Sequence, residues 1–350
     1  MQLFFHLSGE HETLPKGEVL ATLESLAIPH SILNSLDQVF IIEAEIERLD
    51  ELLGRLALTH SISEFYASCE ANFDEIIRLI ENLNIEIEGS YAVRVKRIKE
   101  YSKNVEISKL EREIGGAIWE KGKRSVDLEN PRNILFGMLT DGQFIFGRML
   151  GKVDKSKFES RKPHFRPYFH PSSMSPKLAR TLVNLSRVRM GERLIDPFCG
   201  TGGILIEAGL IGARIFGSDI SEEMVNGCEE NLRHFEVDDF TLMKENVRDL
   251  EDRYSDYFDA IVADPPYGKS STTMGLEPGE LYKGALDSFR SILKPGKFAC
   301  IVSPETIDVE TVAKDAGFEI VEKHLVRIHR SLTRKIVVMK KSVRDTEEGS

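Results

Sequence analysis

The sequence predicts an α/β protein whose C-terminal part is a doubly wound, Rossmann-like parallel sheet with an antiparallel hairpin at its edge. Short apolar runs alternate with helix-like segments between residues 193 and 304, which is typical of parallel strands joined by crossover helices. Two further apolar runs, 318–329 and 334–340, lie close together and indicate the hairpin. The first 150 residues mix strand and helix patterns, which predicts an α+β region.

The C-terminal elements follow from their apolar patterns. We expect strands at 193–198, 214–220, 240–246, 258–264 and 297–303. A helix over 202–213 places four apolar side chains on one face, those of Ile204, Leu205, Ala208 and Ile211. A second helix begins after Ser221, a good N-cap residue. A third helix is expected near 279–293, before the last parallel strand.

The N-terminal elements are expected as follows. Strands are predicted at 39–46 and 91–98, and helices at 73–83 and 109–122. Residues 134–150 predict two strands around a Thr-Asp-Gly-Gln turn. Residues 151–167 are basic and lack periodicity, so we expect a linker there, and residues 344–350 read as a tail.

Composition excludes several classes of protein. The chain has 350 residues, is 41% hydrophobic and 29% charged, and contains no apolar run long enough for a membrane span. Its start lacks the pattern of a signal peptide. The four cysteines form no Cys-x-x-Cys pair, which disfavours zinc and disulfide frameworks and favours a reducing, cytoplasmic location.

Charge is distributed unevenly along the chain. The formal net charge is −11, yet residues 91–190 carry 22 basic and 10 acidic side chains. A basic centre between acidic ends indicates a local anionic ligand such as nucleic acid, because phosphate binding follows the local field. The alternative is a solvated basic surface.

The stretch "DPFCGTGG" (196–203) lies between a predicted strand and a predicted helix. Gly200, Gly202 and Gly203 allow a tight turn and close approach of a ligand. Asp196 would be unfavourable beside a pyrophosphate, so it favours a ligand with a positive group, such as an ammonium or a sulfonium. The alternative is a structural turn rich in glycine.

Two further polar positions follow strands. Asp219 comes about twenty residues after the glycines, where a carboxylate can accept both hydroxyls of a ribose. Asn246 follows the next strand and could bond an adenine edge, and Asp249 is a competitor for that role. Each could equally be a cap or turn residue.

The stretch "ADPPYG" (263–268) ends a buried strand with a carboxylate, two prolines, an aromatic residue and a glycine. Prolines cannot donate to the ladder of a sheet, so the strand stops there. By itself this stretch could be a simple turn.

These motifs in this order resemble class I S-adenosylmethionine-dependent methyltransferases that act on exocyclic amino groups. "VRVKR", "REIGGAI", "VDLENP" and residues 164–180 are similar to THUMP-containing tRNA methyltransferases. "FRPYFHPSSMSP" and "HRSLTR" resemble the archaeal tRNA guanosine-10 N2-methyltransferase family. The chain departs from that family at "ENVRDL", where Asn246 stands in place of the usual Asp.

The resemblance implies a domain organisation. It assigns 1–52 to a ferredoxin-like unit, 53–150 to a THUMP RNA-binding domain, 151–167 to a linker, 168–343 to the catalytic domain and 344–350 to a tail. The partner implied is tRNA, the cofactor is S-adenosylmethionine, and no metal is expected. The sequence carries no signal that identifies a small activating subunit.

The resemblance also implies site residues. Asp264 and the Pro265 carbonyl would accept the two N–H bonds of a guanine N2, and Tyr267 would stack on the extruded base. The cofactor-binding residues implied by the motifs are His170, Ser172, Ser173, Asp196, Gly200, Gly202, Asp219, Asn246 and Asp264. The RNA-binding residues expected from the basic clusters are Arg94, Lys96, Arg97, Lys121, Lys123, Arg124 and Arg166.

The reaction expected is transfer of a methyl group to N2 of a tRNA guanosine at position 10, with one or two methyl groups added. Three alternatives remain: methylation of guanosine 6 of tRNA, methylation of a DNA adenine, and a non-catalytic tRNA-binding protein that retains a relic cofactor fold. A metal enzyme is disfavoured because clustered His and Cys ligands are lacking.

Overall fold

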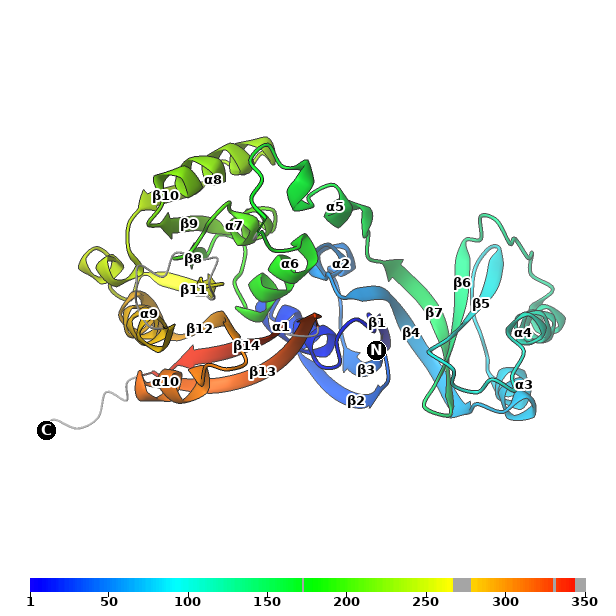
Figure 1. Ribbon diagram of the computed structural model, residues 1–350. Helices are drawn as coiled ribbons and strands as arrows, with labels where there is room; N and C mark the ends of the chain where they lie inside the picture. The colour runs from blue at the N-terminus through cyan, green and yellow to red at the C-terminus, as the bar shows by residue number, and fades with distance from the viewer. Residues whose placement is uncertain (172, 267–277, 330–331, 344–350) are drawn as a thin grey trace, which may run out of the picture. The chain divides into compact units, whose positions relative to one another are not determined.

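The computed structural model describes residues 1–171, 173–266, 278–329 and 332–343 (Figure 1). The chain forms two compact units, and each unit is made of three separate stretches of the sequence. The first unit consists of residues 1–16, 27–54 and 58–154. The second consists of residues 17–26, 55–57 and 155–350. Each unit has its own seven-stranded sheet.

The sheet of the first unit has the strand order β2-β3-β1-β4-β7-β6-β5. Its strands are β1 (Gln2–Leu7), β2 (His30–Leu36), β3 (Val39–Ala44), β4 (Thr59–Glu70), β5 (Tyr91–Arg97), β6 (Asn133–Thr140) and β7 (Gln143–Lys152). All neighbouring pairs are antiparallel except β5 and β6. The long strands β4 and β7 pair with each other, so one continuous sheet runs through the whole unit.

Two helices cover the part of this sheet that contains β5, β6 and β7, as Figure 1 shows. They are α3 (Phe73–Asn82) and α4 (Ile107–Gly122), close to the two helices that the sequence predicts. Ile76 and Ile114, on these helices, belong to one buried cluster with Val93 and Phe144 of the sheet. Burial of such side chains stabilises the unit by roughly 2 kcal/mol each.

The predicted hairpin between β6 and β7 is confirmed. Asp141 and Gly142 both have positive φ, 46° and 72°, as a two-residue hairpin turn of the type I′ class requires. Asparagine, aspartate and glycine adopt this backbone most readily, which explains why the Thr-Asp-Gly-Gln signal was strong.

The sheet of the second unit has the strand order β10-β9-β8-β11-β12-β14-β13. Its strands are β8 (Arg193–Asp196), β9 (Arg214–Asp219), β10 (Phe240–Lys244), β11 (Phe258–Ala263), β12 (Leu293–Pro304), β13 (Phe318–His329) and β14 (Leu332–Lys341). Strands β8 to β12 are parallel, and β14 pairs antiparallel with β12 and β13. The predicted Rossmann-like sheet and its antiparallel edge hairpin are therefore confirmed.

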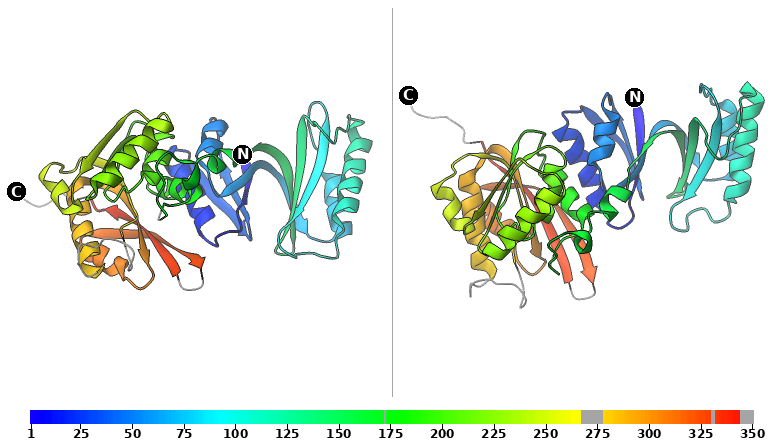
Figure 2. Two further views of the ribbon diagram at one scale, coloured as in Figure 1. Left: turned by 45° about the horizontal axis from the view of Figure 1, so that its top comes forward. Right: turned by 90° about the horizontal axis from the view of Figure 1, so that it is seen from above.

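Helices connect and cover these strands (Figures 1 and 2). They are α5 (Ser156–Glu159), α6 (Pro176–Leu185), α7 (Gly203–Gly209), α8 (Glu222–His234), α9 (Pro278–Ile292) and α10 (Val309–Asp315), with the 3₁₀ helices η1 (Pro163–Phe165) and η2 (Val247–Asp252). Ser221 is the N-cap of α8, as predicted, and its hydroxyl accepts from Met224 N. α9, α10 and η2 share a core with β11 and β12 that includes Tyr282, Phe289 and Val309.

Residues 151–167 differ from the linker that the sequence predicts. β7 runs to Lys152, and α5 and η1 follow. Phe158 is buried, and the Arg161 guanidinium stacks over its ring at 4.8 Å. From Lys155 onward the segment packs as part of the second unit. Its basic composition indicated a solvated segment, but Arg161 forms an ion pair with the buried Glu207.

Most of helix α1 (Leu14–Ser25) lies in the stretch 17–26 that belongs to the second unit, and Glu18 of this stretch is fully buried. Ala57 N and Asn184 Nδ2 donate to Glu18 Oε1 at 3.0 and 2.9 Å. Arg55 Nε donates to Asn184 Oδ1 at 3.2 Å. The second unit is thus completed by two short pieces from the N-terminal part of the chain.

Glu18→Ala is expected to lower the free energy of unfolding by about 2–4 kcal/mol, because buried donors lose their acceptor. Chemical denaturation of the whole chain measures this loss. Glu24→Ala is the matched control on the same helix, because the Glu24 side chain is 46% exposed and its ion pair with Arg187 contributes little. Equal losses in the two variants would contradict the account.

No helix in the described ranges is long and apolar enough to cross a membrane.

Candidate active site

Three aspartates meet at one edge of the second unit's sheet. Asp196 ends β8, Asp219 ends β9, and Asp264 directly follows β11. These strands are neighbours and parallel, with Ile195 opposite Phe216 and Ile261, so their carboxyl ends lie together. In an open α/β sheet, ligands bind at this edge, where the strand order reverses.

The glycine loop between β8 and α7 has the backbone that only glycine adopts easily. Gly200 and Gly202 have φ of 48° and 81°. A Cβ at Gly202 would lie 2.7 Å from Cys228 Sγ, so a side chain does not fit there. A Cβ at Gly200 would meet no atom within 4 Å, so the loop opens onto free space at that point. The absence of a side chain there leaves room for a ligand.

Asp219 holds this loop. Its Oδ2 accepts from Gly200 N at 3.1 Å, and its Oδ1 accepts from Ser221 N at 2.9 Å. The carboxylate therefore lies between the glycine loop and the start of α8.

The segment before α6 lies against the same loop. Ser173 Oγ and Thr201 Oγ1 are 3.0 Å apart, and Ser173 N donates to the His170 carbonyl at 3.0 Å. Asn231 of α8 joins the parts, because its Nδ2 donates to the carbonyls of Tyr168 and Thr201, each at 2.9 Å. His170 and Ser173 are thus brought near the glycine loop. Ser172 lies outside the described residues.

Asp196 is almost completely buried, with 2% of its surface exposed. Burial raises its pKa well above the ordinary range, and the neighbouring carboxylates of Asp264 and Asp219 raise it further. A hydrogen bond from Phe198 N, 3.0 Å from Oδ1, opposes the rise. A cation bound at this edge would relieve the repulsion among the three carboxylates.

Asp264 is the second carboxylate in a poorly solvated position. Burial raises its pKa, and the Arg334 guanidinium, whose Nη1 lies 3.4 Å from Oδ2, lowers it. Asp264 Oδ1 is buried and has no hydrogen-bond partner among the described residues. Pro265 is buried beside it. Tyr267 lies outside the described residues.

Asn246 lies at the same edge. It directly follows Glu245, whose N donates to the Asp219 carbonyl at 3.1 Å. Its Oδ1 accepts from Arg248 N at 3.0 Å, which makes it the N-cap of η2. Asp249 is exposed on η2. The geometry favours Asn246 over Asp249 as the neighbour of an adenine.

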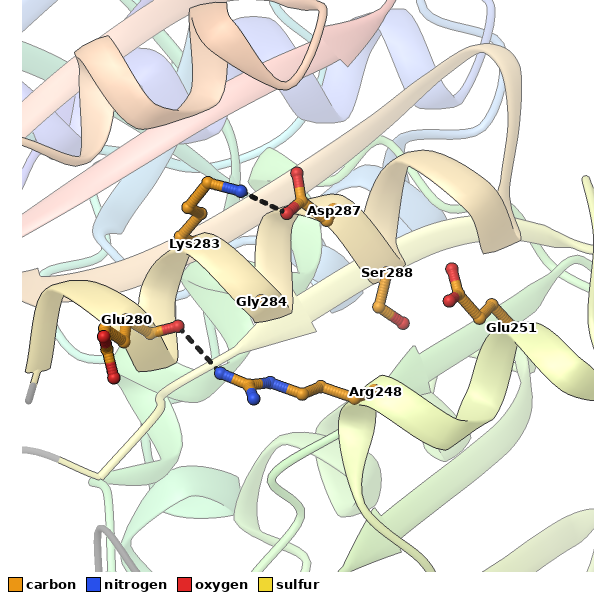
Figure 3. Close-up of a pocket in the computed structure, with 7 residues that line it drawn as sticks. All are labelled: Arg248, Glu251, Glu280, Lys283, Gly284, Asp287 and Ser288. Carbon is orange, nitrogen blue, oxygen red and sulfur yellow. Dashed lines mark hydrogen bonds and ion pairs between the residues drawn. The ribbon is translucent and has the colours of Figure 1, made fainter. Parts of the chain in front are cut away.

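A surface cavity lies between η2 and α9 (Figure 3), and none of the three aspartates lines it. It is lined by Arg248, Glu251, Glu280, Lys283, Gly284, Asp287 and Ser288. Ser288 Oγ donates to the Val247 carbonyl at 2.6 Å, and Arg248 lies across Gly284, where a Cβ would be 2.4 Å from Nε. These contacts fix η2, and with it Asn246, against α9.

Four of the predicted RNA-binding cations bond to backbone carbonyls of their own unit. Arg94 Nη2 donates to Leu128 O at 2.6 Å, and Arg97 Nη2 donates to Val105 O. Lys121 Nζ donates to Leu83 O at 2.8 Å, just beyond α3, and Arg124 Nη1 to Ile85 O at 2.8 Å. These four side chains therefore stabilise the fold of the first unit.

Lys96 and Lys123 differ from those four cations, because both are exposed and neither side chain donates to a backbone carbonyl of the described residues. Lys96 projects from β5, and Lys123 is the C-cap of α4. They are the better candidates for contact with phosphates.

Arg166 is placed differently from the RNA surface that we expected. It is 5% exposed, its Nε donates to the Arg161 carbonyl at 3.1 Å, and a Cβ at Gly203 would be 3.2 Å from its Nη1. A guanidinium buried against α7 does not reach phosphates. Nearby, Arg161 and Arg180 both bond to the buried Glu207, at 2.7 and 2.9 Å.

Sequence reasoning did not identify Asn231, Thr201 or Arg334 as parts of this site. Asn231 acts through bonds from its amide to backbone carbonyls, and Thr201 acts through a bond between hydroxyl groups. The spacing of residues in the sequence does not reveal such long-range bonds. Arg334 lies within "HRSLTR", which the sequence singled out without a role, so that motif was the available signal. Among the described residues, no group of three or more His, Cys, Asp and Glu side chains is placed to hold a metal ion.

Comparison with known proteins agrees with this geometry. Residues 163–336 match the RMKL-like methyltransferase domain family, and residues 67–143 match the THUMP domain. A protein of Methanothermobacter thermautotrophicus named tRNA (guanine(10)-N2)-dimethyltransferase is 41% identical over 343 residues, covering 97% of this chain and 100% of the relative. A protein of Methanocaldococcus jannaschii with the same name is 32% identical, covering 96% and 98%.

The fold has solved counterparts. The crystal structure of TrmN from Thermus thermophilus matches with a TM-score of 0.56 and 20% identity, covering 97% of this chain and 100% of that one. The two chains therefore share a fold.

Proposed function

The chain belongs to the tRNA (guanine(10)-N2)-methyltransferase family, and we propose that it transfers methyl groups from S-adenosylmethionine to N2 of guanosine 10 in tRNA. The observation that carries this proposal is the position of Asp264-Pro265 at the end of β11, beside the glycine loop and Asp219. A site for a nucleoside-containing cofactor and a pair of acceptors for an amino group thus share one sheet edge.

The residues present fit S-adenosylmethionine. The open space at Gly200 leaves room for it, Asp219 could accept from ribose hydroxyls, and Asn246 would be the residue available to contact the adenine. The buried carboxylates around Asp196 favour the cationic amino acid end. When bound, the cofactor supplies an electrophilic methyl group.

Asp264 and Pro265 prepare the acceptor nitrogen. The lone pair of guanine N2 is delocalised into the ring, so the nitrogen is a weak nucleophile. Asp264 Oδ1, which has no partner among the described residues, accepts one N–H, and the Pro265 carbonyl accepts the other. These two bonds draw the nitrogen toward tetrahedral geometry and hold it in line for transfer. The base must leave its helix to reach this site.

Both hydrogens of N2 can be replaced in turn. The two archaeal relatives are named dimethyltransferases, and we propose the same product here. After the first transfer one N–H remains for Asp264, so the second transfer uses the same carboxylate.

A tRNA transcript with inosine at position 10 tests the proposal, because inosine differs from guanosine only in lacking the 2-amino group. We expect methyl incorporation into the guanosine transcript and none above background into the inosine transcript. Equal incorporation would place the target elsewhere and return guanosine 6 to consideration.

We further propose that the exposed cations Lys96 and Lys123 contact tRNA phosphates. Lys96→Ala with Lys123→Ala is expected to weaken tRNA binding and to reduce the slope of log K against log salt concentration by roughly two. Lys314→Ala, at an exposed position of α10, is the control. If the double variant bound tRNA like the control at every salt concentration, the RNA surface would lie elsewhere.

A cytoplasmic location belongs to the same proposal. The four cysteines are free thiols, as expected in a reducing compartment that contains tRNA.

A further inference from the structure

Arg334 is a charged neighbour of Asp264 whose role the proposed reaction leaves open. It lies on β14, opposite Pro304 of β12, and its Nη1 is 3.4 Å from Asp264 Oδ2. The side chains of Arg334 and Asp264 are only 18% and 19% exposed. A cation here is unfavourable beside a cationic cofactor, so its presence needs a reason.

The contact between Arg334 and Asp264 is not an optimal structural ion pair. A single N–O distance of 3.4 Å joins them, whereas a strong arginine–carboxylate pair is bidentate and shorter. Asp264 Oδ1 remains without a partner among the described residues. The pair therefore offers a guanidinium donor and a carboxylate acceptor side by side, with acceptor capacity unused.

This arrangement matches one edge of guanine. The Watson–Crick edge of guanine presents two donors, N2–H and N1–H, followed by one acceptor, O6. The carboxylate of Asp264 complements the donors, and the guanidinium complements the acceptor. Adenine presents a donor where guanine has O6 and an acceptor at N1, so it would place like groups against each other.

We propose that Arg334 donates a hydrogen bond to O6 of the target guanine while Asp264 accepts from its N–H groups, so that Arg334 selects guanine as the substrate base. The inference rests on the proposed function and deepens it. Arg334 then contacts the substrate directly, in addition to its contact with Asp264.

The test uses two synthetic tRNAs that differ in one atom, with guanosine or 6-thioguanosine at position 10. The thio compound keeps N1–H and the 2-amino group but replaces O6 by sulfur, a weak acceptor. The wild-type enzyme and Arg334→Gln are each measured on both substrates, and Arg327→Gln, an exposed arginine of the neighbouring β13, is the control.

We expect the thio substitution to lower kcat/KM of the wild-type enzyme and of Arg327→Gln by roughly tenfold or more. In Arg334→Gln, kcat/KM on the guanosine substrate should fall by roughly tenfold to a hundredfold, and kcat/KM on the two substrates should be nearly equal. If Arg334 only positioned Asp264, Arg334→Gln would have a lower kcat/KM on both substrates by the same factor, and it would still prefer guanosine to 6-thioguanosine as the wild-type enzyme does. That result would overturn the proposal.

Two measurements keep the outcomes separable. The affinity of Arg334→Gln for S-adenosylmethionine reports whether the variant is folded. If it is not, the wild-type comparison decides, and a wild-type enzyme indifferent to the atom at position 6 would refute the proposal. Failure of the wild-type enzyme to methylate the guanosine substrate would refute the proposed function itself.

Discussion

Asp264→Ala is expected to lower kcat by a hundredfold or more while leaving the dissociation constant for S-adenosylmethionine within about threefold. The reason is that Asp264 Oδ1 is the acceptor poised for the substrate N–H, whereas the glycine loop is held by Asp219. Removal of a contact made mainly in the transition state affects turnover more than binding. Single-turnover kinetics and isothermal titration calorimetry measure the two quantities separately.

The same carboxylate predicts the pH dependence of the reaction. Burial raises the pKa of Asp264, and the ionised form is the one that accepts the N–H. Activity should therefore be full above this pKa and should fall as the pH drops through it, at a higher pH than for an ordinary aspartate. Arg334→Gln removes the group that lowers the pKa, so its acid limb should move to higher pH.

Asp315→Ala, an exposed aspartate of α10, is the control for loss of a carboxylate. Normal turnover in Asp264→Ala would contradict the mechanism. A loss of turnover that came with a matching loss of cofactor affinity would instead assign Asp264 to the cofactor site, which is the other role that the sequence suggested.

Asp219→Ala should affect cofactor binding more than turnover, the opposite of what we expect for Asp264→Ala. We expect the dissociation constant for S-adenosylmethionine to rise by roughly thirtyfold to a thousandfold, because about two hydrogen bonds to a charged acceptor are lost. The Gly200 N–H also loses its acceptor, so the loop becomes less well ordered. Turnover at saturating cofactor should fall much less than in Asp264→Ala.

Ser221→Ala is the matched control for Asp219→Ala. It removes the N-cap of α8, which should cost about 1 kcal/mol of stability without a comparable loss of cofactor affinity. An unchanged dissociation constant in Asp219→Ala would show that the carboxylate holds the loop and does not contact the cofactor.

The sequence predicted the edge of the catalytic sheet well because its signals are local. Asp196, Asp219 and Asp264 each end an apolar run, and parallel strands bring such ends together. The cap at Ser221 and the turn at Gly142 likewise depend on a few neighbouring residues. These are the features that sequence patterns report most directly.

Long-range packing is what the sequence did not reveal. The burial of Arg166, and of Arg161 against Glu207, cannot be distinguished from a solvated basic segment by composition. Lys121 appeared to be an RNA contact, although it caps the end of α3 forty residues earlier in the chain. The docking of Glu18 on Asn184 joins residues 166 positions apart. Such partners become visible only in three dimensions.

The most direct test of the central claim maps the methyl group itself. An unmodified tRNA transcript is incubated with the protein and methyl-labelled S-adenosylmethionine, and the digested RNA is analysed by mass spectrometry. We predict label on N2 of guanosine 10, first as the monomethylated and then as the dimethylated nucleoside. Label on another nucleotide or another atom, or no label despite binding of the cofactor, would contradict the account.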